Sequence, residues 1–208
     1  MKKSWLLLLA FTMLNVSGCA QSNRKNDRVV GSACEACELM FNGMPGNPSW
    51  QTTIADPGEP GEPLIISGTI YKKDGKTPAQ NVILYVYHTD NKGLYSPAPK
   101  QTLAKRHGHL RGWMKTDEQG RYEFKTIRPA SYPNSNNPQH IHPLIKEPGV
   151  VLYWIDEFLF EDDPLLTERE KSNQEKRGGS GIITLTKNEK GIWIGKRDII
   201  LGMNIPNY

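Results

Sequence analysis

The strongest constraint on the fold is a series of short runs rich in β-branched and aromatic residues, each bounded by turn residues. Residues 64–71, 82–87 and 121–127 are three such runs, and a turn around Asp74-Gly75 separates the first two. Short runs of this composition between turns are typical of β-strands. We expect residues 64–71 and 82–87 to form neighbouring strands.

Further short strands are expected towards the end of the chain, at residues 150–160, 181–187 and 191–201. Residues 163–172 have the one helical pattern, because Pro164 suits a first helical turn. The chain contains 19 Gly and 15 Pro among 208 residues, roughly 16% against an average of about 12%. The sequence therefore predicts an all-β fold, a β-sandwich of antiparallel strands with long loops and one short helix.

The first residues have the layout of a secretory signal peptide. Lys2 and Lys3 precede an apolar stretch at residues 5–14, which is shorter than the approximately 20 residues of a membrane-spanning helix. Residues 16–19, Val-Ser-Gly-Cys, resemble a bacterial lipobox, which implies cleavage before Cys19 and lipidation of its side chain. The alternative is a plain signal peptide in which Cys19 has no special role.

The chain accordingly divides into three parts. We expect a lipoprotein signal peptide at 1–18, a lipidated tether with a Pro/Gly-rich lead-in at 19–63, and one domain at 64–208. The protein would be exported and anchored to a bacterial membrane by lipid alone. Ala20 after the cysteine is compatible with sorting to the outer membrane, facing the periplasm or the exterior.

The charge of the chain and its cysteines limit which partners and which cross-links we expect. The formal charge is +4 without a long Lys/Arg block, so we expect no nucleic-acid partner. A homo-oligomer is compatible with the sequence, which does not fix the oligomeric state. Cys34 and Cys37 form an even pair in an exported chain, for which a structural disulfide is the simplest prediction. A redox centre or half of a zinc site remains an alternative.

Four of the five histidines occur as two His-x-His pairs. His140 and His142 begin an apolar run that reads as a strand, where residues i and i+2 share a face and can reach one metal ion. His107 and His109 lie in a polar segment between Arg106 and Arg111, and we expect them to be solvated loop histidines.

The residues around His140 and His142 closely resemble the core signature of the intradiol ring-cleavage dioxygenases, which include the catechol and protocatechuate dioxygenases. The signature covers residues 116–133 and the histidine pair. Residues 86–95 are similar to the family segment that ends in its first tyrosine ligand, and residues 160–165 to its Gly-Asp-Pro segment. The resemblance extends from about residue 65 to about residue 200 in the family's motif order.

The resemblance implies a non-haem iron site. The four family ligands fall on Tyr95, Tyr132, His140 and His142. Two phenolates and two imidazoles form a hard, anionic donor set that favours Fe(III). The resemblance further implies that a catechol binds this Fe(III) cofactor, that Tyr132 takes a proton as the catalytic base, and that O2 cleaves the ring to a muconate-type diacid.

Several positions depart from the family pattern. Asn137 stands where catabolic members have an arginine that stabilises substrate charge, and Glu157 stands in place of a glutamine. Both are candidate substrate-binding residues. A carboxylate near a catecholate would repel it unless protonated or paired. The missing positive charge could come from Lys100, Lys105, Arg106 or Arg111, and the sequence does not single out one of them.

Two functional hypotheses follow. The first is a tethered ferric intradiol dioxygenase that acts on a small catechol-like aromatic with O2. The alternative is a lipid-anchored binding or accessory module that uses the same sandwich with a vestigial or altered metal site. The colour of ferric tyrosinate separates the two hypotheses.

Overall fold

The computed structural model describes residues 27–98 and 105–208. The signal peptide, the lipobox with Cys19, and Lys100 lie outside these residues. Within the described part of the chain, no helix has both the length and the apolar character needed to cross a membrane.

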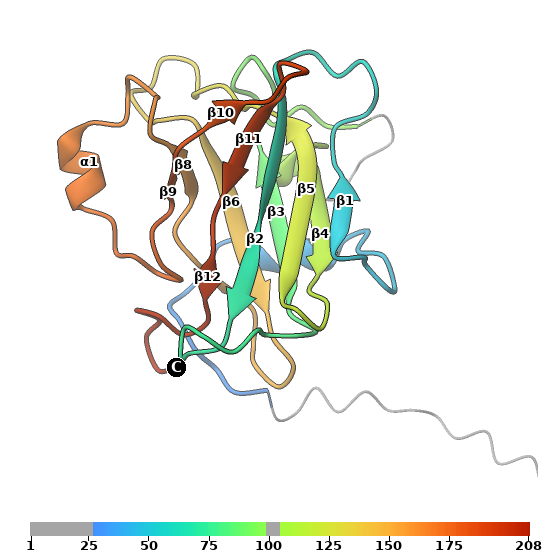
Figure 1. Ribbon diagram of the computed structural model, residues 1–208, viewed down its shortest axis with the longest axis vertical. Helices are drawn as coiled ribbons and strands as arrows, with labels where there is room; N and C mark the ends of the chain where they lie inside the picture. The colour runs from blue at the N-terminus through green and yellow to red at the C-terminus, as the bar shows by residue number, and fades with distance from the viewer. Residues whose placement is uncertain (1–26, 99–104) are drawn as a thin grey trace, which may run out of the picture.

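Two sheets face each other in a sandwich (Figure 1). The first sheet has the order β1-β5-β2-β11-β10, with β12 also paired to β2. Its strands are β1 (Gln51–Thr53), β2 (Pro63–Tyr71), β5 (Arg121–Ile127), β10 (Thr186–Lys187), β11 (Trp193–Lys196) and β12 (Ile199–Ile200).

The second sheet has the order β4-β3-β6-β8-β9, with β7 also paired to β6. Its strands are β3 (Ile83–His88), β4 (Arg111–Lys115), β6 (His140–Lys146), β7 (Tyr153–Trp154), β8 (Phe158–Phe160) and β9 (Ile182–Ile183). The long pairs β2–β5, β3–β4 and β3–β6 are antiparallel. The shorter pairs β1–β5, β2–β11, β2–β12 and β8–β9 are parallel, so the sandwich is mixed at its margins.

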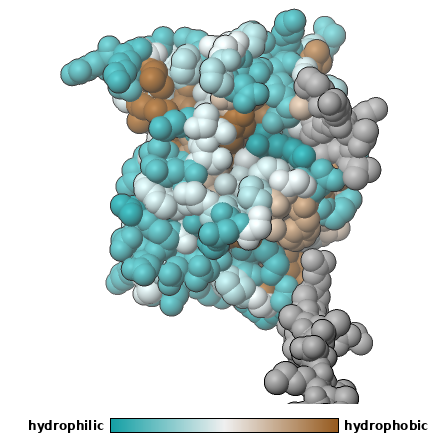
Figure 2. Space-filling view, turned by 90° about the vertical axis from the view of Figure 1, so that its right-hand side faces the viewer, coloured by the Kyte–Doolittle hydropathy of each residue, from teal (hydrophilic) through white to brown (hydrophobic). Residues whose placement is uncertain are grey.

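The main core lies between the two sheets and follows from alternation along the strands. Leu64, Ile66 and Ile70 of β2 face Leu84 and Val86 of β3, and all five are almost completely buried. Figure 2 shows the face beside β1 as mostly hydrophilic, with apolar residues in small separate areas. Two sheets that enclose one core confirm the prediction of a β-sandwich.

A second, smaller core lies on the outer face of the second sheet. There the short 3-10 helix η2 (Cys37–Phe41) packs Cys37 and Met40 against Tyr85 and Leu144. The segment that we placed ahead of the domain also contributes β1 to the first sheet. Residues 27–62 are thus a part of the folded domain.

Three local expectations differ from the structure. The strands at residues 64–71 and 82–87 lie in opposite sheets, because the connection between them crosses from one layer of the sandwich to the other. Residues 150–160, 181–187 and 191–201 each contain two short strands where one was expected, namely β7 and β8, β9 and β10, and β11 and β12. The helix α1 (Glu168–Ser172) begins later than predicted, because Thr167 caps it with a reciprocal capping box.

Candidate metal centre and its two cavities

His140 and His142 lie at the start of β6, on the outer face of the second sheet. Ile141 and Ile145 of the same strand are fully buried in the core, so alternation turns both imidazoles away from it. Strand β6 pairs with β3 on one side and with β8 on the other. The histidine pair therefore sits on a well-supported central strand, on one face as predicted.

Tyr95 and Tyr132 reach the same place from two loops. The loop that follows β3 is shaped by Asp90, whose Oδ1 accepts hydrogen bonds from the backbone N–H groups of Lys92 and Leu94. Its Oδ2 accepts a 2.6 Å bond from the Ser96 hydroxyl. One carboxylate thus holds the residues on both sides of Tyr95.

Direct contacts join the two tyrosine loops. The Thr89 hydroxyl donates to the Ala130 carbonyl at 2.6 Å, and the Ala130 N–H donates to the Asp90 carbonyl at 3.1 Å. Gly93 has a φ of +78°, and a Cβ there would lie 2.0 Å from the Ser131 carbonyl oxygen. The close approach of the loops therefore requires glycine at this position.

The four predicted ligand side chains converge on one point. The Tyr95 and Tyr132 hydroxyl oxygens are 2.6 Å apart, and the His140 and His142 Nε2 atoms are 3.1 Å apart. The Tyr132 oxygen lies 3.0 Å from His140 Nε2 and 3.3 Å from His142 Nε2. Residues far apart in the sequence thus bring two oxygens and two nitrogens together.

The second nitrogen of each imidazole fixes where the proton sits. His140 Nδ1 lies 2.7 Å from the Pro138 carbonyl, a group that can only accept, so Nδ1 carries the proton. His142 Nδ1 lies 3.6 Å from the Glu157 carboxylate, which can only accept, so the proton of the neutral imidazole sits on that side. Both Nε2 atoms therefore present lone pairs towards the tyrosine oxygens.

This arrangement fits a bound cation. Two acceptor nitrogens 3.1 Å apart repel each other unless a donor or a cation lies between them. No group of three or more His, Cys, Asp or Glu side chains suited to a metal occurs among the described residues. A metal at this centre would therefore need the tyrosine oxygens as ligands, and such a donor set suits a hard ion such as Fe(III).

The pKa values of the cluster show which groups are charged when no cation is bound. Burial lowers the pKa of His140, with a further contribution from His142, so the imidazole is held neutral. Burial raises the pKa of Tyr95, as do its hydrogen bond to Tyr132 and the charge of that residue. Burial also raises the pKa of Tyr132. Without a cation both phenols keep their protons, and a bound metal ion would supply the charge that ionises them.

The expectation that His107 and His109 are solvated is wrong. The His107 side chain is only 2% exposed, stacks on Tyr87 with ring centres 3.8 Å apart, and bonds through Nδ1 to the Tyr85 hydroxyl at 2.9 Å. His109 is tied to the Ser96 carbonyl at 2.7 Å and to Glu59 at 3.0 Å. The aromatic side chains of β3 provide a surface for His107 that a polar flanking sequence does not reveal.

Two cavities border the donor cluster and share Tyr132 and His142. The first, about 350 Å³, is also lined by Asn137, His140 and Glu157. Burial alone would raise the pKa of Glu157, but its interaction with His142 outweighs burial and lowers it to about 2. Both departures from the family pattern therefore lie in the first cavity, where Glu157 is a paired carboxylate.

The second cavity, about 440 Å³, lies on the other side of the cluster. Tyr95 and Arg106 line it, together with Glu35 and Ala36 from the N-terminal segment. Of the four basic residues considered for the missing charge, Arg106 thus reaches a cavity at the centre. The guanidinium of Arg111 lies over the Trp113 ring, 5.4 Å from its centre. Glu35 and Ala36 carry no pattern in the sequence that points to this position.

Comparison with known proteins gives a consistent result. The sequence model of a family described as Dioxygenase matches residues 46–177. Catechol 1,2-dioxygenase 1 of Acinetobacter lwoffii is 30% identical over 152 residues, covering 61% of this chain and 48% of the relative. The protocatechuate 3,4-dioxygenase beta chain of Burkholderia cepacia is 32% identical over 117 residues, covering 52% and 49%. The chain spans about half the length of these relatives.

Solved structures share the fold. The dioxygenase domain of a carbohydrate-binding fusion protein from Streptomyces sp. SirexAA-E has a TM-score of 0.56 at 22% identity, covering 76% of this chain and 91% of that domain. Catechol 1,2-dioxygenase from Acinetobacter sp. ADP1 also has a TM-score of 0.56, at 21% identity, and covers 76% and 59%.

Proposed function

Since the chain belongs to the intradiol ring-cleavage dioxygenase family, we propose that it uses non-haem Fe(III) and O2 to cleave a catechol-like aromatic to a muconate-type diacid. The observation that carries the proposal is the donor cluster, in which Tyr95, Tyr132, His140 and His142 place four ligand atoms within hydrogen-bonding distance of their neighbours. This is the ligand set that the resemblance implied.

Each of the four side chains has a role in this proposal. Tyr95, His140 and His142 hold the ion, and their supporting contacts to the Asp90 turn, Pro138 and Glu157 orient them. A bound ferric ion would act as a Lewis acid that activates the catechol towards O2. Of the two tyrosines, Tyr132 lines both cavities. We assign it the second role of base, because its oxygen can take a proton from a catechol hydroxyl in either cavity.

Glu157 has a supporting role in this proposal that a glutamine could not reproduce. Its charged carboxylate faces the Nδ1 side of His142, where it fixes the tautomer and makes Nε2 a stronger donor. A metal bound to Nε2 would supply the positive charge that balances this carboxylate through the imidazole, which reduces its repulsion of a bound catecholate. Asn137 offers the substrate an uncharged hydrogen-bonding group in the same cavity.

The stoichiometry of the reaction tests the proposed function. Intradiol cleavage breaks the bond between the two hydroxylated carbons and places both atoms of one O2 in the diacid, so no other reductant or oxidant is consumed. The iron-loaded protein should take up one O2 per catechol and form a product with the absorption of a muconate. Catechol binding without oxygen uptake would contradict the proposal and support a binding module.

We further propose that the chain is exported and anchored through a lipid on Cys19. Bacteria that express it are grown with an alkyne-tagged palmitate, and the protein is then probed for the tag. The wild type and a Cys34→Ser variant should be labelled, whereas Cys19→Ser should not. Label retained on Cys19→Ser would refute the lipid anchor.

A further inference from the structure

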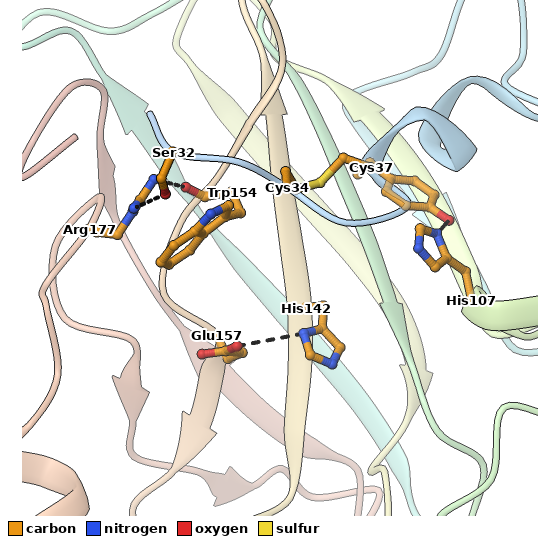
Figure 3. Close-up of a disulfide and its surroundings, with 9 residues drawn as sticks. Ser32, Cys34, Cys37, His107, His142, Trp154, Glu157 and Arg177 are labelled. Carbon is orange, nitrogen blue, oxygen red and sulfur yellow. Dashed lines mark hydrogen bonds and ion pairs between the residues drawn. A yellow bond between two sulfur atoms is a disulfide. The ribbon is translucent and has the colours of Figure 1, made fainter. Parts of the chain in front are cut away.

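The N-terminal residues 33–37, which we call the strap, cross the outer face of the second sheet beside the donor cluster. Figure 3 shows the chain from Ser32 to Cys37 passing over strand β6, which carries His142, near the segment ahead of β8 that carries Glu157, with His107 near its far end. Glu35 and Ala36 line the second cavity together with Tyr95 and Tyr132. A third hollow of about 160 Å³ lies between the strap, His142 and Glu157.

The strap is anchored ahead of its first residue. The Arg28 backbone bonds to Gly149 and Val151 at 2.9 Å, and the Gly31 N–H donates to the Pro206 carbonyl at 2.7 Å. The Ser32 hydroxyl accepts a 3.1 Å hydrogen bond from the buried Arg177.

The strap is anchored equally firmly after its last residue. Met40 is fully buried, and its carbonyl accepts a 2.6 Å hydrogen bond from the Trp113 indole N–H. Between the two anchors, the Cys34–Cys37 disulfide closes a loop with the Cα atoms 5.6 Å apart. Ala36 has a φ of 60°, in the left-handed region that is costly for alanine. The tip of the strap is thus held in one conformation beside the cavity.

A pair of opposite charges joins the tip of the strap to the other side of the cavity. Glu35 accepts a 2.5 Å hydrogen bond from the guanidinium of Arg106, which precedes His107 in the 3-10 helix η3 (Lys105–His107). The side chains remain 79% and 65% exposed. An ion pair this exposed contributes little stability. Either charge can therefore exchange its partner for a charged group on a bound ligand at small cost.

We propose that the strap forms the outer wall of the substrate cleft, and that Glu35 and Arg106 discriminate among catechols by the charge of the ring substituent. The proposal rests on the proposed function, because the cleft is defined by the metal centre. A carboxylate on the ring would be attracted by Arg106 and repelled by Glu35, and an amine would show the opposite preference. The unsubstituted ring would be indifferent to both.

The test measures binding without turnover. Iron-loaded protein is titrated under anaerobic conditions with catechol, a carboxylated catechol and an aminoethyl catechol, and the visible absorption band reports binding. Glu35→Gln should strengthen binding of the carboxylated ligand and weaken that of the amine, and Arg106→Gln should do the reverse. We expect changes of about two- to fivefold, the range of an exposed charge interaction.

Two further variants complete the test. Glu38→Gln is the matched control, because Glu38 is an exposed acid of η2, next to the strap, and it should change nothing. The double variant Cys34→Ser/Cys37→Ser should keep the iron colour and lose most of the discrimination among the three ligands. As a second readout, hydrogen exchange at residues 33–36 should slow when a catechol binds.

The outcomes separate this proposal from the proposed function. If catechol binds but Glu35→Gln and Arg106→Gln leave the affinities of all three ligands unchanged, as the control should, or shift all three equally, the strap does not discriminate substrates by charge. Unchanged hydrogen exchange in the strap would lead to the same conclusion. If the wild type binds no catechol at all, the proposed function fails, and this inference fails with it.

Discussion

At the scale of single residues, the centre depends on where protons sit. His140 is fixed as the Nδ1–H tautomer by the Pro138 carbonyl, and the two tyrosine oxygens share a hydrogen bond in a partly buried position. Each donor is therefore oriented before any ion binds, which lowers the cost of assembling the site. In the proposed function, Tyr132 both binds the ion and takes a proton from the substrate.

Replacing Tyr132 by phenylalanine removes that oxygen and leaves the ring. We expect the rate of catechol cleavage by the Tyr132→Phe variant to fall by at least about 100-fold, the usual loss on removal of a general base. Steady-state oxygen uptake measures the rate. Tyr71→Phe is the control, because Tyr71 lies at the end of β2 in the other sheet. A Tyr132→Phe variant with wild-type turnover would remove Tyr132 from the mechanism.

At the scale of elements, one central strand and two loops joined by hydrogen bonds bring the four side chains together. Strand β6 supplies both histidines with fixed spacing, whereas the tyrosines depend on the contact between their loops at Gly93 and Ser131. A change at this contact should therefore disturb the metal centre while the sandwich core between the sheets remains.

Gly93→Ala tests this dependence. The added Cβ would meet the Ser131 carbonyl at 2.0 Å, in addition to the strain of a positive φ, which by itself costs about 1–2 kcal/mol. We expect a large loss of iron content and a lower free energy of unfolding, measured by metal analysis and denaturation. Gly58→Ala is the control, because Gly58 has a φ of +90° with nothing within 4 Å of an added Cβ. Equal effects of the two variants would show that the loop contact is unimportant.

The elements also show how far sequence reasoning reaches. Residues 121–127 were identified without error, because a turn precedes them and apolar side chains alternate along them. The assignment of strands to one sheet or the other could not be predicted, because local sequence patterns do not show whether a connection crosses from one sheet to the other. The His140 and His142 pair follows from strand alternation, but Tyr95 and Tyr132 needed the family resemblance to stand out among eight tyrosines.

The contacts of the strap lay beyond sequence reasoning for a different reason. Glu35 and Arg106 are 71 residues apart and both exposed, so neither hydrophobic periodicity nor a spacing rule connects them. His107 was misassigned because its burial depends on Tyr85 and Tyr87 of a neighbouring strand. Polar and aromatic contacts between distant segments of the chain are fixed by the tertiary fold alone.

At the scale of the whole molecule, a buried histidine makes the folding stability of the sandwich depend on pH. His88 lies between the sheets, where its Nδ1–H donates to the Thr89 carbonyl and its Nε2 accepts from the Thr126 hydroxyl, both at 2.7 Å. Burial lowers the pKa of His88 from its ordinary 6.5 to about 4. Between these values the unfolded chain binds the proton more tightly than the folded one, so stability falls as the pH falls.

We therefore expect the wild type to lose roughly 2 kcal/mol of unfolding free energy between pH 7 and pH 5 from His88 alone. Burial also lowers the pKa of His107 to about 4, which adds a loss of the same sign. Urea denaturation at the two pH values measures the loss, and His88→Gln should make the dependence shallower. A wild type equally stable at pH 7 and pH 5 would show that these histidines do not link folding to pH.

The central claim is that Tyr95, Tyr132, His140 and His142 bind one ferric ion. The most direct test is the visible absorption spectrum of the purified protein loaded with iron, with the iron content measured on the same sample. We predict one iron per chain and a broad ferric-tyrosinate band that weakens in Tyr95→Phe and in Tyr132→Phe. A protein that stays colourless when fully loaded, or a band that both substitutions leave unchanged, would contradict the claim.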